Sequence, residues 1–516
     1  MSKKNKKIIL EGLFITDYAA EGKALAKLDG KVIFISGAVP GDVADVLLTK
    51  NKKDWAEGRV LKIKELSKER VDPFCKHFGI CGGCKWQMLP YAKQLQYKQQ
   101  EVEQNLRRIG KVELPEILPI IGADDTVYYR NKLEFTFSNK QYYPNPLPPS
   151  PKEKAPPPPE GGISEPDEII KSFAIAESEA PPSEGFGEAV PPLGGGGGFG
   201  ALGFHVPRIF DKVIDIDECY LMDDVNNKIR NTVRAFALEN NFTFYDIRQH
   251  TGWLRNIIIR LCTTGELMVN ICLNFDEETD RKKLFDHLLQ QVPQITTLLY
   301  TINPKWNDSI YDLTPQVYFG KGFATEKLST GSVGEDFEFK ISPKSFFQTN
   351  TKQAEKLYRV TREFAALTGN EIVYDLYCGT GSIGIFVSKQ AKKIIGVEVI
   401  EEAIADAKEN AALNNINHAE FFAGDVIKIC NDDFFNVHGR PDVIITDPPR
   451  AGMHEKLVNK LLEMAAPKIV YVSCNTATQA RDLGLLSEKY QVEKIQPVDM
   501  FPHTHHIECV VLLKLR

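Results

Sequence analysis

The chain has 516 residues, and its 63 Lys and Arg against 69 Asp and Glu give a formal net charge of −6. Because a single hydrophobic core stops growing at about 250–300 residues, this length predicts more than one domain. The sequence contains no run of about 18 apolar residues, which argues against a membrane-spanning helix and a membrane partner. The apolar run at 8–10 is too short for a signal sequence, so we expect a cytoplasmic protein whose cysteines are thiols or metal ligands.

The negative charge is concentrated in one segment, residues 144–203. This segment holds nine acidic residues, three lysines and fourteen of the 30 prolines, and its charge of −6 equals that of the whole chain. A composition of this kind buries too little apolar surface to offset its ordering entropy, so it predicts a disordered insert. The rest of the chain is neutral overall, and its charge does not argue against a nucleic-acid partner.

Residues 1–68 predict a small antiparallel β-barrel of the OB-fold type. Short apolar runs such as Val32–Ile35 and Val43–Leu48 alternate with glycine-containing turns, which is typical of such barrels. The segments 37–42 and 50–53 resemble the TRAM version of this fold, an RNA-binding module. A generic all-β domain with a solvated lysine turn is an equal alternative at this point.

Residues 69–341 predict a central α+β domain, and residues 342–516 predict a doubly wound domain. In the central part we expect a helical segment at 90–118 that docks on the C-terminal domain, strands at 127–138, 203–216, 254–262 and 266–274, and a helix at 222–240. In the C-terminal part, strands and helices alternate in βαβα order, which predicts a parallel, Rossmann-like sheet. The fold class is therefore α/β, preceded by a β-barrel and an α+β domain.

A glycine-rich loop at 375–384 follows a predicted strand of the C-terminal domain and opens a helix. Gly379 and Gly381 allow the backbone to turn sharply and approach a ligand, and Glu398 ends the next strand, where a carboxylate can bind ribose hydroxyls. Because the loop also matches GxGxxG, a nicotinamide cofactor is a serious alternative. Asp375, which precedes the glycines, suits S-adenosylmethionine better than a pyrophosphate.

Further polar residues follow later strands of the same domain. Asp425 can accept a hydrogen bond from an adenine amino group or can serve only as a helix N-cap. Cys474 comes directly after an apolar strand and has a polar residue on each side. In this it differs from the cysteines that we expect in the hydrophobic core. Glu508 begins the last strand, where a carboxylate beside a cysteine nucleophile can act as a base.

These motifs in this order resemble the RNA uracil-5-methyltransferase family. The matching segments are 341–350, the Asp375 loop, 447–450, 473–475 and 501–508. The cofactor site for S-adenosyl-L-methionine then comprises Gln348, Asp375, Tyr377, Gly379, Gly381, Glu398, Asp425 and Asp447. The resemblance implies that Asp447 holds the uracil, that Cys474 is the nucleophile and that Glu508 is the base. The family usually has proline where this chain has Thr476, and we expect only a local change of the loop.

The chemistry explains why these residue types are needed. C5 of uracil is a poor nucleophile, but attack of a thiolate on C6 makes an enolate whose C5 can accept a methyl group. A base must then remove the C5 proton so that the cysteine can be eliminated. The target base must be unstacked for a side chain to reach C6.

A second group of cysteines consists of Cys75, Cys81 and Cys84, with Cys219 as the candidate fourth member. Close thiolates in a reducing compartment predict a metal site, and the spacing fits either zinc or an iron–sulfur cluster. The resemblance favours a [4Fe–4S] cluster, because the ribosomal branch of the family carries one on matching cysteines. The tRNA branch typically lacks both the cluster and the TRAM domain.

The sequence thus predicts a cytoplasmic, monomeric enzyme that methylates C5 of a uridine in 23S rRNA. The same chemistry on tRNA is the second hypothesis. A non-catalytic RNA-binding iron–sulfur protein is the third, and the presence of both Cys474 and Glu508 argues against it.

Overall fold

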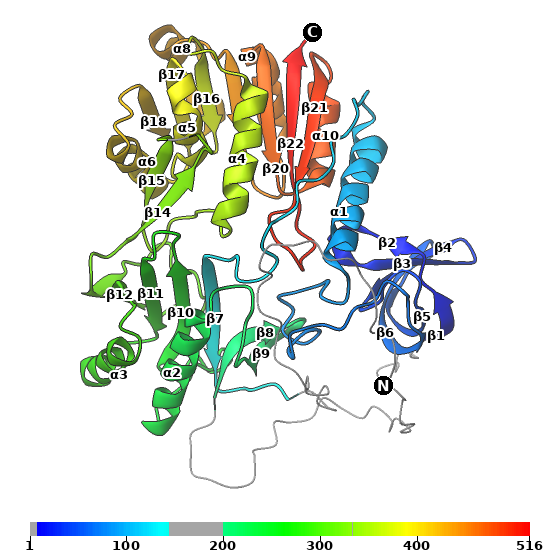
Figure 1. The fold of residues 1–516 in the computed structure, drawn as a ribbon, viewed down its shortest axis with the longest axis vertical. Helices are drawn as coiled ribbons and strands as arrows, with labels where there is room; N and C mark the ends of the chain where they lie inside the picture. The colour runs from blue at the N-terminus through cyan, green and yellow to red at the C-terminus, as the bar shows by residue number, and fades with distance from the viewer. Residues whose placement is uncertain (1–7, 144–199, 333) are drawn as a thin grey trace.

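The computed structural model describes residues 8–143, 200–332 and 334–516. Three β-sheet regions surround a loop at the centre of the molecule (Figure 1). The predicted insert lies outside the described residues, except that residues 201–203 belong to strand β8. None of the described helices is long and apolar enough to cross a membrane.

The N-terminal region is a six-stranded sheet in the order β1-β5-β6-β4-β3-β2. Its elements are β1 Ile9–Phe14, β2 Asp17–Tyr18, the short turn η1 Ala20–Gly22, β3 Ala24–Leu28, β4 Lys31–Ser36, β5 Val43–Asn51 and β6 Trp55–Glu65. The expectation of purely antiparallel pairing was wrong at one place, since β4 and β6 pair in parallel. The reason is that β5 and β6 form a hairpin, and the connection at 37–42 carries the chain across so that β6 returns beside β4 in the same direction.

The central region is a seven-stranded sheet in the order β13-β12-β11-β10-β7-β8-β9. Its elements are β7 Lys132–Ser138, β8 Ala201–Val206, β9 Ile209–Asp215, α2 Val225–Glu239, β10 Leu254–Leu261, β11 Leu267–Leu273, α3 Glu278–Gln291, β12 Thr297–Ile302 and β13 Gln316–Phe319. The strand expected at 127–138 begins only at Lys132, because the N–H groups of Tyr128 and Arg130 donate to the carbonyls of Tyr220 and Leu221 instead. The strand expected at 203–216 is a hairpin, β8 and β9, rather than one strand.

The C-terminal region is a seven-stranded sheet in the order β18-β17-β16-β19-β20-β22-β21. Its elements are α4 Thr351–Ala365, β16 Ile372–Leu376, α5 Ser382–Val387, η3 Ser388–Gln390, β17 Lys393–Glu398, α6 Glu401–Leu413, β18 Ala419–Ala423, α7 Val426–Ile429, α8 Asp432–His438, β19 Val443–Thr446, α9 Glu455–Met464, β20 Lys468–Ser473, α10 Thr476–Leu486, β21 Tyr490–Val498 and β22 Glu508–Leu515. Strands β18, β17, β16, β19 and β20 are parallel, and β22 and β21 complete the sheet in antiparallel pairs. The predicted doubly wound α/β fold is confirmed, and its direction of winding reverses between β16 and β19, where such folds bind ligands.

The hairpin of β14 Ala324–Ser329 and β15 Asp336–Ile341 lies within the predicted central range of 69–341. Its Leu328, Phe337 and Phe339 nevertheless pack into the core of the C-terminal sheet. The predicted domain bounds stay predictions, and this hairpin is where the packing departs from them.

Helix α1, Tyr91–Asn105, connects the N-terminal sheet to the C-terminal one (Figure 1). It continues in a π-helical turn, η2 Leu106–Gly110, that packs on α10. The helix expected at 90–118 therefore ends at Gly110. The two helices approach closely at two glycines, since a Cβ atom added to Gly484 would lie 3.0 Å from the carbonyl oxygen of Gly110.

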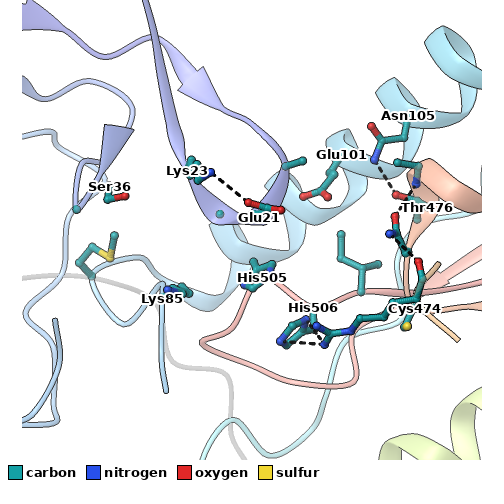
Figure 2. Close-up of a pocket in the computed structure, with 18 of the residues that line it drawn as sticks. Glu21, Lys23, Ser36, Lys85, Glu101, Asn105, Cys474, Thr476, His505 and His506 are labelled. Carbon is teal, nitrogen blue, oxygen red and sulfur yellow. Dashed lines mark hydrogen bonds and ion pairs between the residues drawn. The ribbon is translucent and has the colours of Figure 1, made fainter. Parts of the chain in front are cut away.

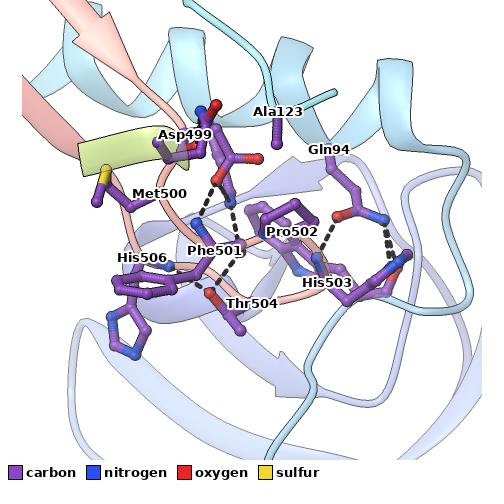
Figure 3. Close-up of polar contacts among 12 residues, drawn as sticks. Gln94, Ala123, Asp499, Met500, Phe501, Pro502, His503, Thr504 and His506 are labelled. Carbon is purple, nitrogen blue, oxygen red and sulfur yellow. Dashed lines mark hydrogen bonds and ion pairs between the residues drawn. The ribbon is translucent and has the colours of Figure 1, made fainter. Parts of the chain in front are cut away.

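The loop 499–507, which we call the junction loop, lies between α1 and the start of β22 (Figure 3). At its beginning, Lys98 Nζ is 2.6 Å from Asp499 Oδ1, and both side chains are fully buried. Tyr91 donates its hydroxyl to the other carboxylate oxygen at 2.8 Å. Further along, Gln94 accepts a hydrogen bond from the backbone N–H of His503 at 2.8 Å. Helix α1 thus holds the beginning and the middle of the junction loop.

Removal of one partner of the buried ion pair should be strongly destabilising. Lys98→Met leaves the Asp499 carboxylate buried without its cation, so we expect the free energy of unfolding to fall by about 3–5 kcal/mol in a urea titration. Lys93→Met on the same helix is the control, because Lys93 pairs with Glu69 at the surface and should cost about 1 kcal/mol or less. Equal effects of the two substitutions would contradict the role given to the buried pair.

Candidate active site

The candidate nucleophile and base face each other across two neighbouring strands. Strands β20 and β22 are antiparallel, and Ser473 pairs with Cys509. The next residue of one strand and the preceding residue of the other, Cys474 and Glu508, therefore lie opposite each other at the end of the ladder. Asp447 follows the adjacent strand β19 at the same edge of the sheet. The structure thus brings together the three residues expected to carry the chemistry.

These groups also interact electrostatically. Burial raises the pKa of Asp447, and burial together with the nearby Asp447 raises the pKa of Glu508 well above its ordinary value. Burial, Glu508 and Asp447 raise the pKa of the Cys474 thiol to about 11, while the Arg450 guanidinium opposes this shift. At neutral pH the site therefore holds a protonated thiol beside carboxyl groups that retain protons readily, and such shifts are typical of sites for acid–base chemistry.

The residues around Cys474 fix the position of its backbone. Asn475 caps α10, with its side-chain oxygen accepting hydrogen bonds from the N–H groups of Ala477 and Thr478. Its amide nitrogen donates to the carbonyl of Arg450 at 3.0 Å, which ties the loop after β19 to the loop after β20. Ser473 accepts a hydrogen bond from the Asn475 N–H at 3.1 Å. The thiol is therefore carried on a rigid turn, not on a free loop.

Thr476 is the first residue of α10, and its hydroxyl accepts a hydrogen bond of 2.8 Å from Asn105 of α1. Proline is favoured at this first helical position because its missing N–H is not needed there. Threonine keeps the helix start and adds a polar contact to α1, so the departure from the family pattern is accommodated locally.

A cavity of about 550 Å³ opens onto Cys474 (Figure 2). Its walls come from the turn between β2 and β3, from α1, from the junction loop and from the start of α10. Sequence reasoning missed the contribution of α1, whose Glu101 and Asn105 point into this cavity (Figure 2). They stand four residues apart on one helix face. Polar residues at that spacing usually face solvent, so the sequence does not distinguish these two cavity residues from ordinary surface residues.

The candidate cofactor residues lie on the other side of Asp447, around the glycine-rich loop. The backbone turns here through three left-handed residues, Tyr377, Gly379 and Gly381, with φ values of 61°, 53° and 77°. Asp375 accepts a hydrogen bond from the N–H of Gly384 at 2.8 Å, and its other carboxylate oxygen is buried without a partner among the described residues. The side chain of Glu398 accepts from the Gly379 N–H at 3.3 Å. Burial, aided by Asp447 and Glu398, raises the pKa of Asp375 to about 7.

Two further predicted cofactor residues flank this loop. Asp425 is the N-cap of α7 and accepts a hydrogen bond from the N–H of Ile427 at 2.9 Å, while its role toward a cofactor stays a prediction. Burial, with a smaller contribution from the Asp425 carboxylate, raises the pKa of the Tyr377 phenol. Gln348 is buried in the segment before α4, where its carbonyl accepts a hydrogen bond from Asn131 at 2.9 Å.

The four candidate metal ligands line a second cavity, of about 130 Å³, in the central region. They are Cys75, Cys81, Cys84 and Cys219. Burial raises the pKa of Cys75 to about 12, with smaller contributions from Cys81 and Cys219. Among the described residues, no group of three or more His, Cys, Asp or Glu side chains is arranged to hold a single metal ion. The thiols share one enclosed space without forming a tight single-ion site.

The raised pKa of Cys474 makes a direct prediction about its reactivity. Because the thiolate is the nucleophile, alkylation of Cys474 by iodoacetamide should be slower than that of free cysteine at about pH 8 and should rise about tenfold per pH unit up to about pH 10. Arg450→Met should slow alkylation further, since it removes the cation that lowers this pKa.

Mass spectrometry of the Cys474 peptide measures the rate despite the other cysteines. Arg440→Met is the control, because Arg440 forms an exposed pair with Asp432 far from the thiol. A rate that levels off near the pKa of free cysteine would contradict the assigned environment.

Family models and relatives agree with this architecture. A model described as tRNA (Uracil-5-)-methyltransferase matches residues 313–516, and the TRAM domain model matches residues 14–61. A protein of Bacteroides thetaiotaomicron named an uncharacterized RNA methyltransferase is 50% identical over 96% of this chain and 100% of its own length. One of the same name from Porphyromonas gingivalis is 46% identical over 97% of this chain and 98% of its own.

A solved structure extends the similarity to the whole fold. The crystal structure of Pyrococcus abyssi tRNA (uracil-54, C5)-methyltransferase in complex with S-adenosyl-L-homocysteine has a TM-score of 0.67 and 25% sequence identity. The match covers 98% of this chain and 100% of that chain. The chain therefore belongs to the RNA uracil-5-methyltransferase family and is an RNA methyltransferase that carries a TRAM domain.

Proposed function

We propose that this enzyme methylates C5 of a uridine in 23S rRNA with S-adenosyl-L-methionine as the methyl donor. The observation that carries the proposal is the placement of Cys474 opposite Glu508, with Asp447 beside them at the carboxyl edge of the sheet. The reaction needs a thiol, a base and a group that orients the uracil within one site. This chain has all three at one edge of the C-terminal sheet, and Cys474 lines a cavity that is open to a nucleic acid.

The methyl donor supplies an electrophilic methyl group when it is bound beside this site. The residues that we assign to it surround the glycine-rich loop, and they are Gln348, Asp375, Tyr377, Gly379, Gly381, Glu398, Asp425 and Asp447. The unpartnered oxygen of Asp375 supports the assignment, because a buried carboxylate oxygen without a donor is costly unless a ligand provides one. The P. abyssi enzyme, which was solved with S-adenosyl-L-homocysteine, supports the choice of donor.

The residues of this chain then act in sequence on the uracil. Cys474 gives its proton to water in the open cavity, and its thiolate then attacks C6. Arg450 favours the thiolate that this step requires. Asp447 orients the ring through its N3/O4 edge, and Arg450 stabilises negative charge on the enolate oxygen. After C5 has been methylated, Glu508 removes the C5 proton and Cys474 leaves C6. The raised pKa of Glu508 suits this step, because a weaker acid is a stronger base once it is ionised.

We further propose that Cys75, Cys81, Cys84 and Cys219 hold a [4Fe–4S] cluster. The four thiols line one cavity in the central region, and their spacing along the chain is compatible with zinc as well as with an iron–sulfur cluster. A cluster places several irons between its ligands, which suits four thiols that line one cavity with apolar walls. Its role is structural, since it joins the segment 75–84 to the loop before α2.

The choice of 23S rRNA rests on the TRAM domain and the cysteine set, but transfer RNA is a real second candidate. The P. abyssi enzyme is a tRNA (uracil-54, C5)-methyltransferase, and its match covers 98% of this chain. The overall layout is therefore compatible with either RNA, and only the reaction itself separates them.

A direct assay tests both the reaction and the RNA class. Purified protein with S-adenosyl-L-methionine should form 5-methyluridine in unmodified 23S rRNA and not in tRNA, as measured by nucleoside mass spectrometry. Cys474→Ala should abolish the product, whereas Cys430→Ala, at a buried cysteine outside the site, should retain it. Glu508→Gln should accumulate a covalent RNA adduct, because methyl transfer proceeds but elimination cannot. Product in tRNA alone would favour the second candidate, and no product in either RNA would overturn the proposal.

The proposed cluster should be detectable by its visible absorbance and by its iron and sulfide content. Anaerobically purified protein should absorb broadly in the visible region and contain iron and sulfide, and Cys81→Ser should reduce both because one ligand is lost. Cys272→Ser, at a buried cysteine in strand β11, is the control and should keep both. Stoichiometric zinc without iron would contradict the cluster.

A further inference from the structure

The cavity that opens onto Cys474 extends well beyond the nucleophile. At its far end, the turn between β2 and β3 contributes Glu21 and Lys23, and the segment before α1 contributes Lys85. Arg208 and Arg450 add two more cations to the walls. The surplus of positive charge in this cavity suits the phosphates of several nucleotides. We therefore expect the cavity to bind nucleotides next to the target uridine as well as the target itself.

One carboxylate in this cavity lacks a partner. Glu21 is paired with Lys23 at 3.2 Å, but among the described residues Glu101 has neither a hydrogen bond nor an ion pair. Lys98, one turn away on α1, is committed to Asp499 at 2.6 Å. Burial raises the pKa of Glu101 to about 7, and the opposing effect of Lys98 is smaller than the effect of burial. A half-buried carboxylate left without a donor is costly, and a ligand that brings donors would remove that cost.

The location of Glu101 relates it to the nucleophile. It lies four residues before Asn105, on the same face of α1, and Asn105 is bonded to Thr476, two residues after Cys474. Figure 2 shows Glu101 on this helix with its side chain toward the cavity, between Glu21 and Asn105. Glu101 is thus displaced from Cys474 toward the N-terminal sheet, where a nucleotide next to the target would lie.

We propose that Glu101 selects the base beside the target uridine by binding the Watson–Crick edge of a guanine. The inference rests on the proposed function, in that the cavity binds RNA with a uridine at Cys474. It adds a specificity-determining residue on α1 that takes no part in methyl transfer.

Guanine is the base whose chemistry fits a carboxylate. Its Watson–Crick edge presents two parallel donors, N1–H and the exocyclic amino group, which match the two oxygens of one carboxylate. Adenine and cytosine each present a single amino donor flanked by a ring nitrogen acceptor, which repels a carboxylate. Uracil presents one donor between two acceptors. Unstacked bases in single-stranded RNA are read by such contacts on their Watson–Crick edges.

Selection of bound RNA from a randomised pool tests the inference without the methyl donor. Single-stranded oligonucleotides with one central uridine and random neighbours are bound to the full-length protein at about pH 8.5, where the Glu101 carboxyl is ionised, and the bound fraction is sequenced. We expect guanine to exceed uridine by about tenfold at one neighbouring position, the size of a charge-assisted contact to a base. Glu101→Gln should abolish this preference, because an amide has one donor and one acceptor side by side and can pair with the edge of any base.

Glu103→Gln is the matched control on the same helix, because Glu103 accepts a hydrogen bond from Gln99 outside the cavity lining. It should keep the guanine preference, and thermal unfolding should be alike for all three proteins. A wild-type protein without guanine preference, or a Glu101→Gln variant with the same preference, would overturn the inference. A protein that selects guanine through Glu101 but forms no 5-methyluridine would sustain the inference while the proposed function fails.

Discussion

The ion pair between Lys98 and Asp499 connects the three regions of this protein. Asp499 begins the junction loop, and its backbone carbonyl also accepts a hydrogen bond from Gln353 of α4 at 2.6 Å. Tyr129, which precedes the central sheet, donates to the carbonyl of Pro502 in the same loop. Because the loop leads directly into Glu508, the position of the candidate base depends on contacts from α1, from the central region and from the C-terminal helices together.

A buried ion pair adds little net stability to the fold. The free energy lost when two charges are removed from water offsets most of the attraction between them. What the pair provides is specificity, because a displacement of α1 from the loop would leave two buried charges without their partner. The candidate active site shows the opposite case, in which groups of like charge are buried together. Asp447 and Glu508 are buried close together without a compensating ion pair among the described residues, so folding raises both pKa values and prepares the site for proton transfer.

The parts of the structure that repeat a regular pattern could be predicted from the sequence. The doubly wound order follows from the alternation of strands and helices in the C-terminal part. Polar residues after parallel strands could be assigned to one edge for the same reason. The parallel pairing of β4 with β6 and the β14–β15 hairpin could not, because both depend on tertiary packing that leaves no local signal. The position of Glu101 in the cavity could not be predicted for a related reason, since the sequence of a helix face does not show which part of the protein packs against it.

Gly22 has a further consequence for how the cavity is bounded. It lies in the turn between β2 and β3 with a φ of 68°, and a Cβ atom at this position would approach the Cβ of His505 to 3.0 Å. The side chain of Trp86 is similarly near on the other side, at 3.2 Å. The absence of a side chain at Gly22 therefore lets the turn between β2 and β3 approach the junction loop this closely. A larger residue here would have to displace His505 or Trp86, so this one position limits how tightly the N-terminal sheet closes over the loop that leads into the candidate base.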